Sequence, residues 1–341
     1  MTALLEARHL TKIFGGGLFG RGRRTRALHD FSLRVDTQPP SITAIVGESG
    51  SGKTTLANLL LGVISPTLGE VVYRGKSFHA MTSAERRAFR RDVQVIFQDP
   101  YDAYNPFYKV DHVLAKPIAN FQLARSRRDA LKLMEEALEA VGLRPEDTLG
   151  RYPHQLSGGQ RQRIMVARAL LVKPRLIIAD EPVSMVDASL RATILGSLRN
   201  LNRDFGISIV YITHDVTTAY QISQNVIVLY GGSVAEAGDV ELVIQQPQHP
   251  YTQLLIGSIP SPNPRHRWIR QAAPSDGAGG AASVTSNGSC SFAARCPFVM
   301  PKCRELDPPL FQTDEHRIVA CYLHEAAATT DAGVMNEVFV R

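Results

Sequence analysis

A glycine-rich string early in the chain combines the residue types that hold phosphate. It matches the pattern G-x-x-x-x-G-K-[ST], in which glycines let backbone N–H groups turn toward the phosphates. Lys53 would contact the β- and γ-phosphates, and the Thr54 hydroxyl would bind Mg²⁺. An apolar, β-branched run (41–46) precedes the string and a predicted helix (53–61) follows it, as the motif requires, so the sequence predicts a nucleotide site. Its residues are Gly47, Glu48, Ser49, Gly50, Ser51, Gly52, Lys53, Thr54 and Thr55.

Two carboxylates follow a second apolar run, 176–179. Asp180 would hold Mg²⁺ through water, and Glu181 would orient or deprotonate the attacking water. Many strands end in acidic residues, so this pair is informative only because the glycine-rich string lies upstream. Phosphoryl transfer needs a metal-binding carboxylate facing Lys53, and the two strings together therefore predict nucleotide hydrolysis.

The string LSGGQRQR, residues 156–163, opens a second predicted helix at 157–171. Glycines at a helix start leave backbone N–H groups that can bind an anion. The string resembles the signature motif of ATP-binding cassette (ABC) ATPases. In that family the signature of one subunit completes the ATP site of another. The resemblance implies ATP contacts for Ser157, Gly158, Gly159 and Gln160.

Three further residues resemble functional positions of the same family. Gln98 follows a predicted strand and matches the glutamine that senses Mg²⁺ and the transmembrane partner. His214 follows another predicted strand and matches the histidine that contacts the γ-phosphate. Phe14 matches the aromatic residue that stacks on adenine, and the alternative is an ordinary core or surface phenylalanine.

Two strings resemble the peptide/nickel importer branch of the family. QDPY at 98–101 is followed by Asn105-Pro106, and QHPYT at 248–252 is followed by SIP at 258–260. Neither has a chemical role that the residues reveal. The resemblance implies an ATPase that powers uptake of peptides, nickel or oligosaccharides. It implies a second ABC ATPase subunit, identical or not, two transmembrane permease subunits and, indirectly, an extracytoplasmic solute-binding protein. It also implies a peripheral location on the cytoplasmic face of the inner membrane.

The four cysteines lie close together near the end of the sequence, at Cys290, Cys296, Cys303 and Cys321. Free structural thiols are one interpretation, but random placement would rarely confine all four cysteines to so short a segment. Zinc suits four thiolates, but the Cys-x2-Cys pairs typical of zinc modules are missing. A [4Fe–4S] cluster is favoured, since four cysteines are its usual ligands. The segment also resembles the C-terminal extension of peptide-importer ATPases, some of which carry this cluster. The conservative interpretation is that the site has a structural role and stabilises this small extension.

The composition excludes other classes of protein. No apolar run approaches the roughly 18 residues of a membrane span. The first eight residues lack the apolar core of a secretory signal, so we expect a cytosolic chain. The net charge of +6 is too small to argue for nucleic acid, and we expect no such partner. The alternative function is a soluble ABC ATPase acting on nucleic acid or ribosomes. Such proteins usually carry two cassettes or long coiled-coil insertions, which the 341 residues lack.

Alternation of apolar strands and helices predicts an α/β fold with a parallel sheet. The resemblance makes this a P-loop NTPase (RecA-like) cassette with a helical subdomain and a small cysteine-containing extension. The clearest helix spans 125–142, with Leu131, Met134 and Leu138 on one face. We expect a cassette at 1–257 with its helical subdomain near 99–168, a flexible linker at 258–289, the extension at 290–325 and a tail at 326–341.

Overall fold

The computed structural model describes residues 3–15, 24–98, 104–259 and 288–340. These residues form two compact units. Unit 1 comprises Asp36–Ile42 and His79–Thr213, and unit 2 comprises Ala3–Val35, Thr43–Phe78 and the described residues from 214 onward. Most of the predicted linker at 258–289 lies outside the described residues, as do Asp99, Pro100 and Tyr101.

Unit 1 contains three parallel strands in the order β6–β7–β8. The β7 and β8 side chains are buried except for Asp180, which is half-buried at the end of β7. Burial on both faces explains why these strands read as continuous apolar runs. β7 matches the apolar run predicted at 176–179 within one residue, and β6 and β8 are the strands predicted before Gln98 and His214. They are β6 (Val93–Ile96), β7 (Leu176–Asp180) and β8 (Ser208–Thr213).

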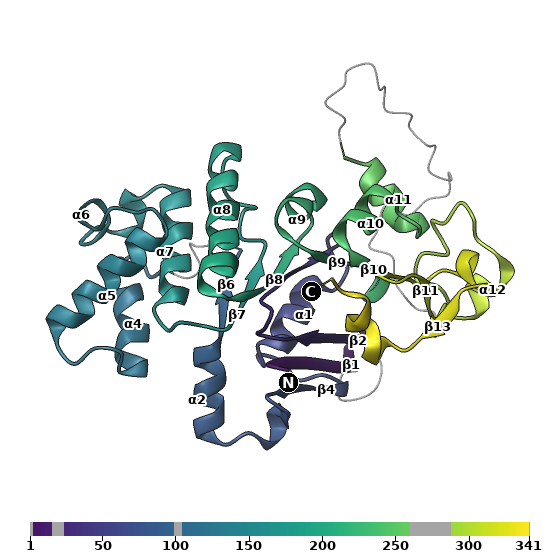
Figure 1. Ribbon diagram of the computed structural model, residues 1–341, viewed down its shortest axis with the longest axis horizontal. Coiled ribbons are helices and arrows are strands. Elements are labelled where there is room, and N and C mark those ends of the chain that lie inside the picture. The colour runs from purple at the N-terminus through teal and green to yellow at the C-terminus, as the bar shows by residue number, and fades with distance from the viewer. Residues whose placement is uncertain (1–2, 16–23, 99–103, 260–287, 341) are drawn as a thin grey trace, which may run out of the picture. The chain divides into compact units, whose positions relative to one another are not determined.

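The helices of unit 1 include a group in which α4, α5 and α7 contact one another and α6 contacts α5 (Figure 1). Ser126 caps α5, because its hydroxyl accepts a hydrogen bond from the Asp129 N–H at 3.1 Å. Met134 and Leu138 are buried, but Leu131 is 47% exposed, so the predicted apolar face is too wide. The helices are α2 (Ser83–Asp92), α4 (Asp111–Phe121), α5 (Arg127–Ala140), α6 (Pro145–Thr148), α7 (Gly158–Leu170) and α8 (Ala188–Phe205).

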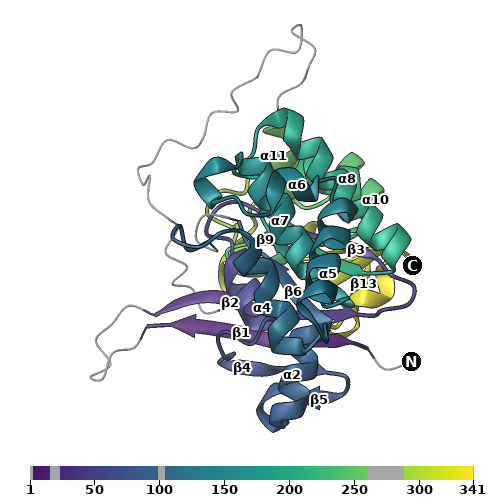
Figure 2. The same ribbon diagram turned by 90° about the vertical axis from the view of Figure 1, so that its left-hand side faces the viewer.

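Unit 2 contains an antiparallel sheet in which β1 lies between β2 and β4 (Figure 2). In its other sheet, β3 and β9 are parallel, and β9 forms an antiparallel hairpin with β10. The first sheet consists of β1 (Leu5–Phe14), β2 (Thr25–Val35), β4 (Leu68–Tyr73) and β5 (Lys76–Ser77). The second includes β3 (Ile42–Val46), β9 (Asn225–Tyr230), β10 (Ser233–Asp239), β11 (Leu310–Asp314), β12 (Arg317–Val319) and β13 (Ala328–Thr330).

The remaining helices are short. In the described part of the chain, no helix combines the length and apolar character that crossing a membrane requires. The α-helices of unit 2 are α1 (Lys53–Leu60), α9 (Val216–Ile222), α10 (Val240–Gln245), α11 (Pro250–Gly257) and α12 (Pro301–Glu305). The 3-10 helices are η1 (Phe78–Ala80), η2 (Pro153–Gln155), η3 (Tyr322–His324) and η4 (Ala332–Val338).

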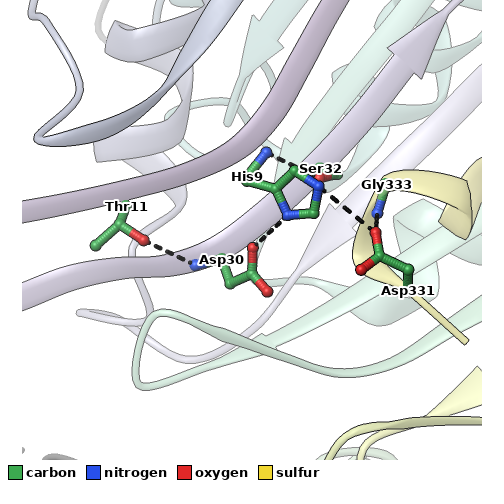
Figure 3. A network of polar contacts seen from close by, with 6 residues as sticks. All are labelled: His9, Thr11, Asp30, Ser32, Asp331 and Gly333. Atoms are coloured by element: carbon green, nitrogen blue, oxygen red, sulfur yellow. Dashed lines mark hydrogen bonds and ion pairs between the residues drawn. The ribbon is translucent and has the colours of Figure 1, made fainter. Parts of the chain in front are cut away.

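The C-terminal segment of unit 2 is bound to its N-terminal sheet by polar contacts. His9 on β1 lies between two carboxylates, with Nδ1 2.7 Å from Asp30 and Nε2 3.5 Å from Asp331 (Figure 3). On η4, the Asn336 amide exchanges two hydrogen bonds with the Arg34 backbone, at 2.6 and 2.7 Å. The last described residues are therefore part of the folded unit.

Candidate functional site

The glycine-rich loop between β3 and α1 has a backbone that only glycine fits. Gly52, which precedes α1, has φ of 102°, and a Cβ placed there would lie 2.4 Å from the Ala27 carbonyl oxygen. A Cβ on Gly47 would lie 2.2 Å from the Leu229 carbonyl oxygen. The loop is thus packed between β2 and β9, and its path into α1 is fixed by close backbone contacts.

Lys53, predicted to bind phosphate, is only 5% exposed. Its Nζ donates to the carbonyl oxygens of Gly47 and Glu48, at 2.7 and 2.9 Å, and lies 3.5 Å from the Ser51 hydroxyl. The ammonium group therefore lies against its own loop and contacts oxygen atoms of that loop. The oxygens of a bound phosphate could take the place of these contacts. Thr54 is exposed at the start of α1, which leaves its hydroxyl accessible to a metal ion.

The predicted hydrolytic residues Gln98 and Glu181 meet in unit 1. Gln98 Nε2 donates to Glu181 Oε2 at 3.0 Å. Glu181 follows Asp180 directly, and its backbone N–H donates to the Ile212 carbonyl at 2.8 Å. Its φ of 47° lies in the left-handed region, which is unfavourable for a residue with a side chain and is often found at functional sites. The Glu181 backbone is therefore held by β8, and its carboxylate is held by the Gln98 side chain.

The signature residues form the start of α7. The Ser157 hydroxyl accepts from the Gln160 N–H at 3.2 Å, and Gln160 Oε1 accepts from the Ser157 N–H at 2.9 Å. This reciprocal pair is a capping box, which fixes the first turn. A Cβ on Gly159 would lie 2.5 Å from Leu190 Cδ1, so α8 lies close against this turn.

The two remaining predicted residues of the nucleotide site, His214 and Phe14, are exposed in unit 2. His214 follows β8 directly, and Phe14 ends β1. Phe14 is 44% exposed and Lys12 Nζ lies 5.1 Å from its ring centroid, so it is not a core residue. Its accessible ring is of the kind that can stack on a planar base.

Residues that the sequence did not single out support Gln98. Gln162 on α7 is 1% exposed, and its Nε2 donates to the Phe97 carbonyl at 3.3 Å. The Tyr104 hydroxyl donates to the Arg161 carbonyl at 2.9 Å. The chain on both sides of Gln98 is therefore attached to α7. Gln162 belongs to the signature string, but its residue type gave no signal of this contact.

Tyr251, from the string QHPYT, reaches the phosphate-binding loop. It is fully buried, and its hydroxyl accepts a hydrogen bond from the Glu48 N–H at 2.9 Å. Its ring packs against Tyr230 and Phe292, with centroids 4.5 and 5.6 Å apart. The string therefore has a structural role in supporting the loop, which its residue types alone did not reveal.

The four cysteines line one pocket in unit 2, together with apolar residues that include Phe292 and Met300. All four are free thiols; Cys303 is buried and the other three are half-buried. Burial raises the pKa of the Cys290 thiol to about 11 and also raises the pKa values of Cys296 and Cys321. Within the described ranges, no three or more His, Cys, Asp or Glu side chains are arranged to hold a metal ion. The structure thus gathers the thiols without showing a metal centre.

Comparisons with known proteins place the chain in a family. Residues 28–184 match the family model described as "ABC transporter", and residues 235–303 match "Oligopeptide/dipeptide transporter, C-terminal region". The chain is 38% identical over 334 residues to the "Putative oligopeptide transport ATP-binding protein YkfD" of Bacillus subtilis, covering 96% of this chain and 98% of that protein. It is 38% identical over 329 residues to the "Dipeptide transport ATP-binding protein DppF" of Haemophilus influenzae, covering 94% and 97%.

A solved structure shares the fold at a TM-score of 0.61 and 29% identity. Its title is "Dimeric structure of a post-hydrolysis state of the ATP-binding cassette MJ0796 bound to ADP and Pi", and the match covers 69% of this chain and 98% of that one. The predicted α/β cassette fold is confirmed by this similarity. The chain therefore belongs to the ABC transporter family, as an ATP-binding subunit whose enzymatic activity is ATP hydrolysis.

Proposed function

We propose that this protein powers an importer of peptides or a related small solute, as a peripheral subunit on the cytoplasmic face of the inner membrane. The observation that carries the proposal is the match of residues 235–303 to the oligopeptide/dipeptide transporter C-terminal region. Curated relatives similar over nearly the whole chain have names that refer to oligopeptide and dipeptide transport.

In the proposed ATP site, each residue has one role. Lys53 binds the β- and γ-phosphates, and Thr54 and Asp180 hold Mg²⁺, which neutralises charge that develops on the phosphates. Glu181 accepts a proton from the attacking water, and His214 contacts the γ-phosphate. The hydrogen bond from Gln98 supports this assignment, because it orients the Glu181 carboxylate before any ligand arrives.

The proposed assembly contains two ATPase subunits and two permease subunits, and it receives solute from a binding protein. The sequence contains one glycine-rich loop and one signature, so a second ATPase subunit must complete each ATP site. Ser157, Gly159 and Gln160 would contact the nucleotide held by that second subunit. The capping box supports this role, because it presents the start of α7 in a fixed geometry.

Glu181→Gln tests the proposed function. In proteoliposomes with the permease, we expect ATP turnover and peptide uptake to fall by about 10²- to 10⁴-fold, as loss of a general base would cause. ATP should still bind, and an ATP-bound dimer should accumulate in size-exclusion chromatography. Glu139→Gln, an exposed glutamate on α5, is the matched control. Normal turnover in Glu181→Gln, or stimulation by DNA or ribosomes instead of the permease, would contradict the proposal.

We also propose that the cysteine pocket holds a [4Fe–4S] cluster that staples the C-terminal segment. Four thiols around one pocket with apolar residues fit this group. A single zinc ion needs four sulfurs about 2.3 Å from one point, whereas a cluster spreads its ligands over several irons. Among the described residues, no three or more His, Cys, Asp or Glu side chains are arranged to hold a metal ion, so the proposal rests on the pocket that the four thiols share.

Metal analysis tests the cluster. Protein purified without oxygen should be brown and contain about four iron and four sulfide per chain. Cys303→Ser should lose both and unfold at lower temperature, while the control Lys53→Ala, which leaves the cysteines intact, should keep its iron. Colourless protein with one zinc per chain and no sulfide would refute the cluster and identify the alternative site.

A further inference from the structure

We propose that Arg295 is a positioning residue for the phosphate-binding loop. Arg295 lies in the cysteine-containing segment, between Cys290 and Cys296, and forms a two-point ion pair with Glu48. Its Nη1 lies 2.9 Å from Glu48 Oε2 and its Nη2 lies 3.1 Å from Glu48 Oε1. Such paired contacts fix the orientation of both groups better than one hydrogen bond does.

Arg295 is itself held by aromatic side chains. Its guanidinium lies 5.6 Å from the Tyr230 ring centroid and 5.7 Å from that of Phe292. The Tyr230 hydroxyl also accepts a hydrogen bond from Nη1 at 3.4 Å. Phe292 is 2% exposed and lines the cysteine pocket, so it is a rigid support. The guanidinium thus has little rotational freedom to lose when it pairs with Glu48.

Glu48 is fixed at three points. Arg295 pairs with its side chain, its N–H donates to the Tyr251 hydroxyl at 2.9 Å, and its carbonyl accepts from Lys53 Nζ at 2.9 Å. The residue that Arg295 holds is therefore the same residue whose carbonyl holds the phosphate-binding lysine. A change at Arg295 acts on Lys53 through Glu48, without contact between Arg295 and the nucleotide.

The pair also has an electrostatic role. Glu48 is an acidic residue inside a loop that must receive a polyanion, and an unpaired carboxylate there would repel it. Arg295 neutralises this charge and keeps the carboxylate directed toward itself. Both side chains are about two-fifths exposed, so solvent screens the pair and its effect is moderate. We expect Arg295→Gln to weaken ATP binding about three- to tenfold, mainly by leaving Glu48 charged and unpaired.

A double-mutant cycle with ATP as the probe tests the inference. The full-length protein is compared as wild type, Arg295→Gln, Glu48→Gln and the double variant. The dissociation constant for ATP is measured in EDTA, and KM and kcat are measured with Mg²⁺.

Arg295→Gln should raise the dissociation constant and KM three- to tenfold, with kcat within twofold. The double variant should lose no more affinity than Arg295→Gln alone, because both changes break the same ion pair. Arg295→Lys should recover part of the affinity, since it keeps the charge but loses the two-point geometry.

Arg304→Gln is the matched control, because Arg304 is an exposed arginine on α12 in the same segment, and it should leave ATP binding unchanged. The melting temperature shows whether each variant keeps its fold. If Arg295→Gln unfolds, Glu48→Gln still tests the pair from the loop side. It should raise the dissociation constant for ATP, though by less than Arg295→Gln, because it breaks the same ion pair without leaving an unpaired carboxylate.

The inference rests on the proposed nucleotide-binding role of the loop, and the two can fail separately. If the wild type binds ATP no more tightly than Lys53→Ala does, the assignment of the loop to nucleotide binding is refuted. If the wild type binds ATP and Lys53→Ala does not, then wild-type affinity in Arg295→Gln overturns the positioning role. Additive losses in the double variant would also overturn it, because independent effects show that the two side chains do not act through each other.

Discussion

At the scale of single residues, burial sets the charge of Glu236 and His249. Glu236 is fully buried on β10 and accepts hydrogen bonds from the N–H groups of Gln248 and His249. Burial raises its pKa to about 7, although those bonds and the nearby Arg317 oppose the rise. His249 is 4% exposed, and burial, with His324 nearby, lowers its pKa to about 4. Both side chains therefore favour their neutral forms.

The two groups predict opposite pH effects on stability. Between pH 4.5 and about 7, folded Glu236 keeps a proton that the unfolded chain releases, so the free energy of unfolding falls as pH rises. Between about 4 and 6.5, unfolded His249 takes a proton that the folded form refuses, so the free energy of unfolding rises with pH. Each effect is worth roughly 3 kcal/mol at about 1.4 kcal/mol per pH unit, and in the wild type they largely cancel.

Glu236→Gln should remove the contribution of Glu236 to this pH dependence and leave that of His249. Its free energy of unfolding, measured with urea at pH 5, 6 and 7, should rise with pH more steeply than that of the wild type. His249→Asn should show the opposite change in slope. Glu305→Gln, an exposed glutamate in the same unit, should follow the wild type. An unchanged slope in Glu236→Gln would mean that this carboxyl is already ionised in the folded protein.

At the scale of elements, the same capping device begins two helices of unit 1. Ser157 and Gln160 begin α7, and Thr82 and Glu85 begin α2. The second helix start lies outside the string that resembles the ABC signature. The pair therefore offers a comparison between a cap that has a proposed role in catalysis and a cap that has only a structural role.

Ser157→Ala and Thr82→Ala should each lower the free energy of unfolding by about 1 kcal/mol, the usual cost of losing such a cap. Only Ser157→Ala should also reduce ATP turnover in the assembled transporter. The measurements are urea unfolding and steady-state ATPase rates on the same preparations. Equal loss of turnover in both variants would assign Ser157 a purely structural role.

The sequence predicted β7 and β8 because each is an apolar run buried on both faces. It did not identify β11, β12 and β13 as strands, since these short segments gain stability only by pairing, as β12 does with β10. Leu131 was assigned to the buried face of α5 because periodicity shows which side is apolar, not how widely neighbours cover it.

The difference between local sequence patterns and long-range contacts also separates the functional residues that the sequence predicted from those that it did not. Lys53 and Ser157 belong to strings whose chemistry depends on neighbours in sequence, so their motifs were readable. Tyr251 supports the loop from 203 positions away, and Gln162 reaches Phe97 from 65 positions away. Residue types at such distances carry no information about which contact they form, and only the folded chain shows it.

At the scale of the whole molecule, the two ends of unit 2 meet at Asn336 and Arg34, which are 302 positions apart. Asn336→Ala removes both hydrogen bonds and leaves the Arg34 backbone without this partner. We expect the free energy of unfolding to fall by about 1–2 kcal/mol, because two bonds of ordinary strength are lost. Urea unfolding measures this, and the exposed neighbour Glu337→Ala is the control. No change in Asn336→Ala would show that η4 contributes little to stability.

The ion pair between Glu48 and Arg295 has a consequence for the order in which the protein is made. The two residues are 247 positions apart, so ribosomes synthesising about 5–20 residues per second add Arg295 roughly 12–50 s after Glu48. During that interval the nascent glycine-rich loop lacks the partner of its acidic residue, and for most of it the loop also lacks the Tyr251 hydroxyl, which is added 203 positions after Glu48. A growing chain therefore cannot adopt the finished loop, and full nucleotide affinity arises only near the end of translation.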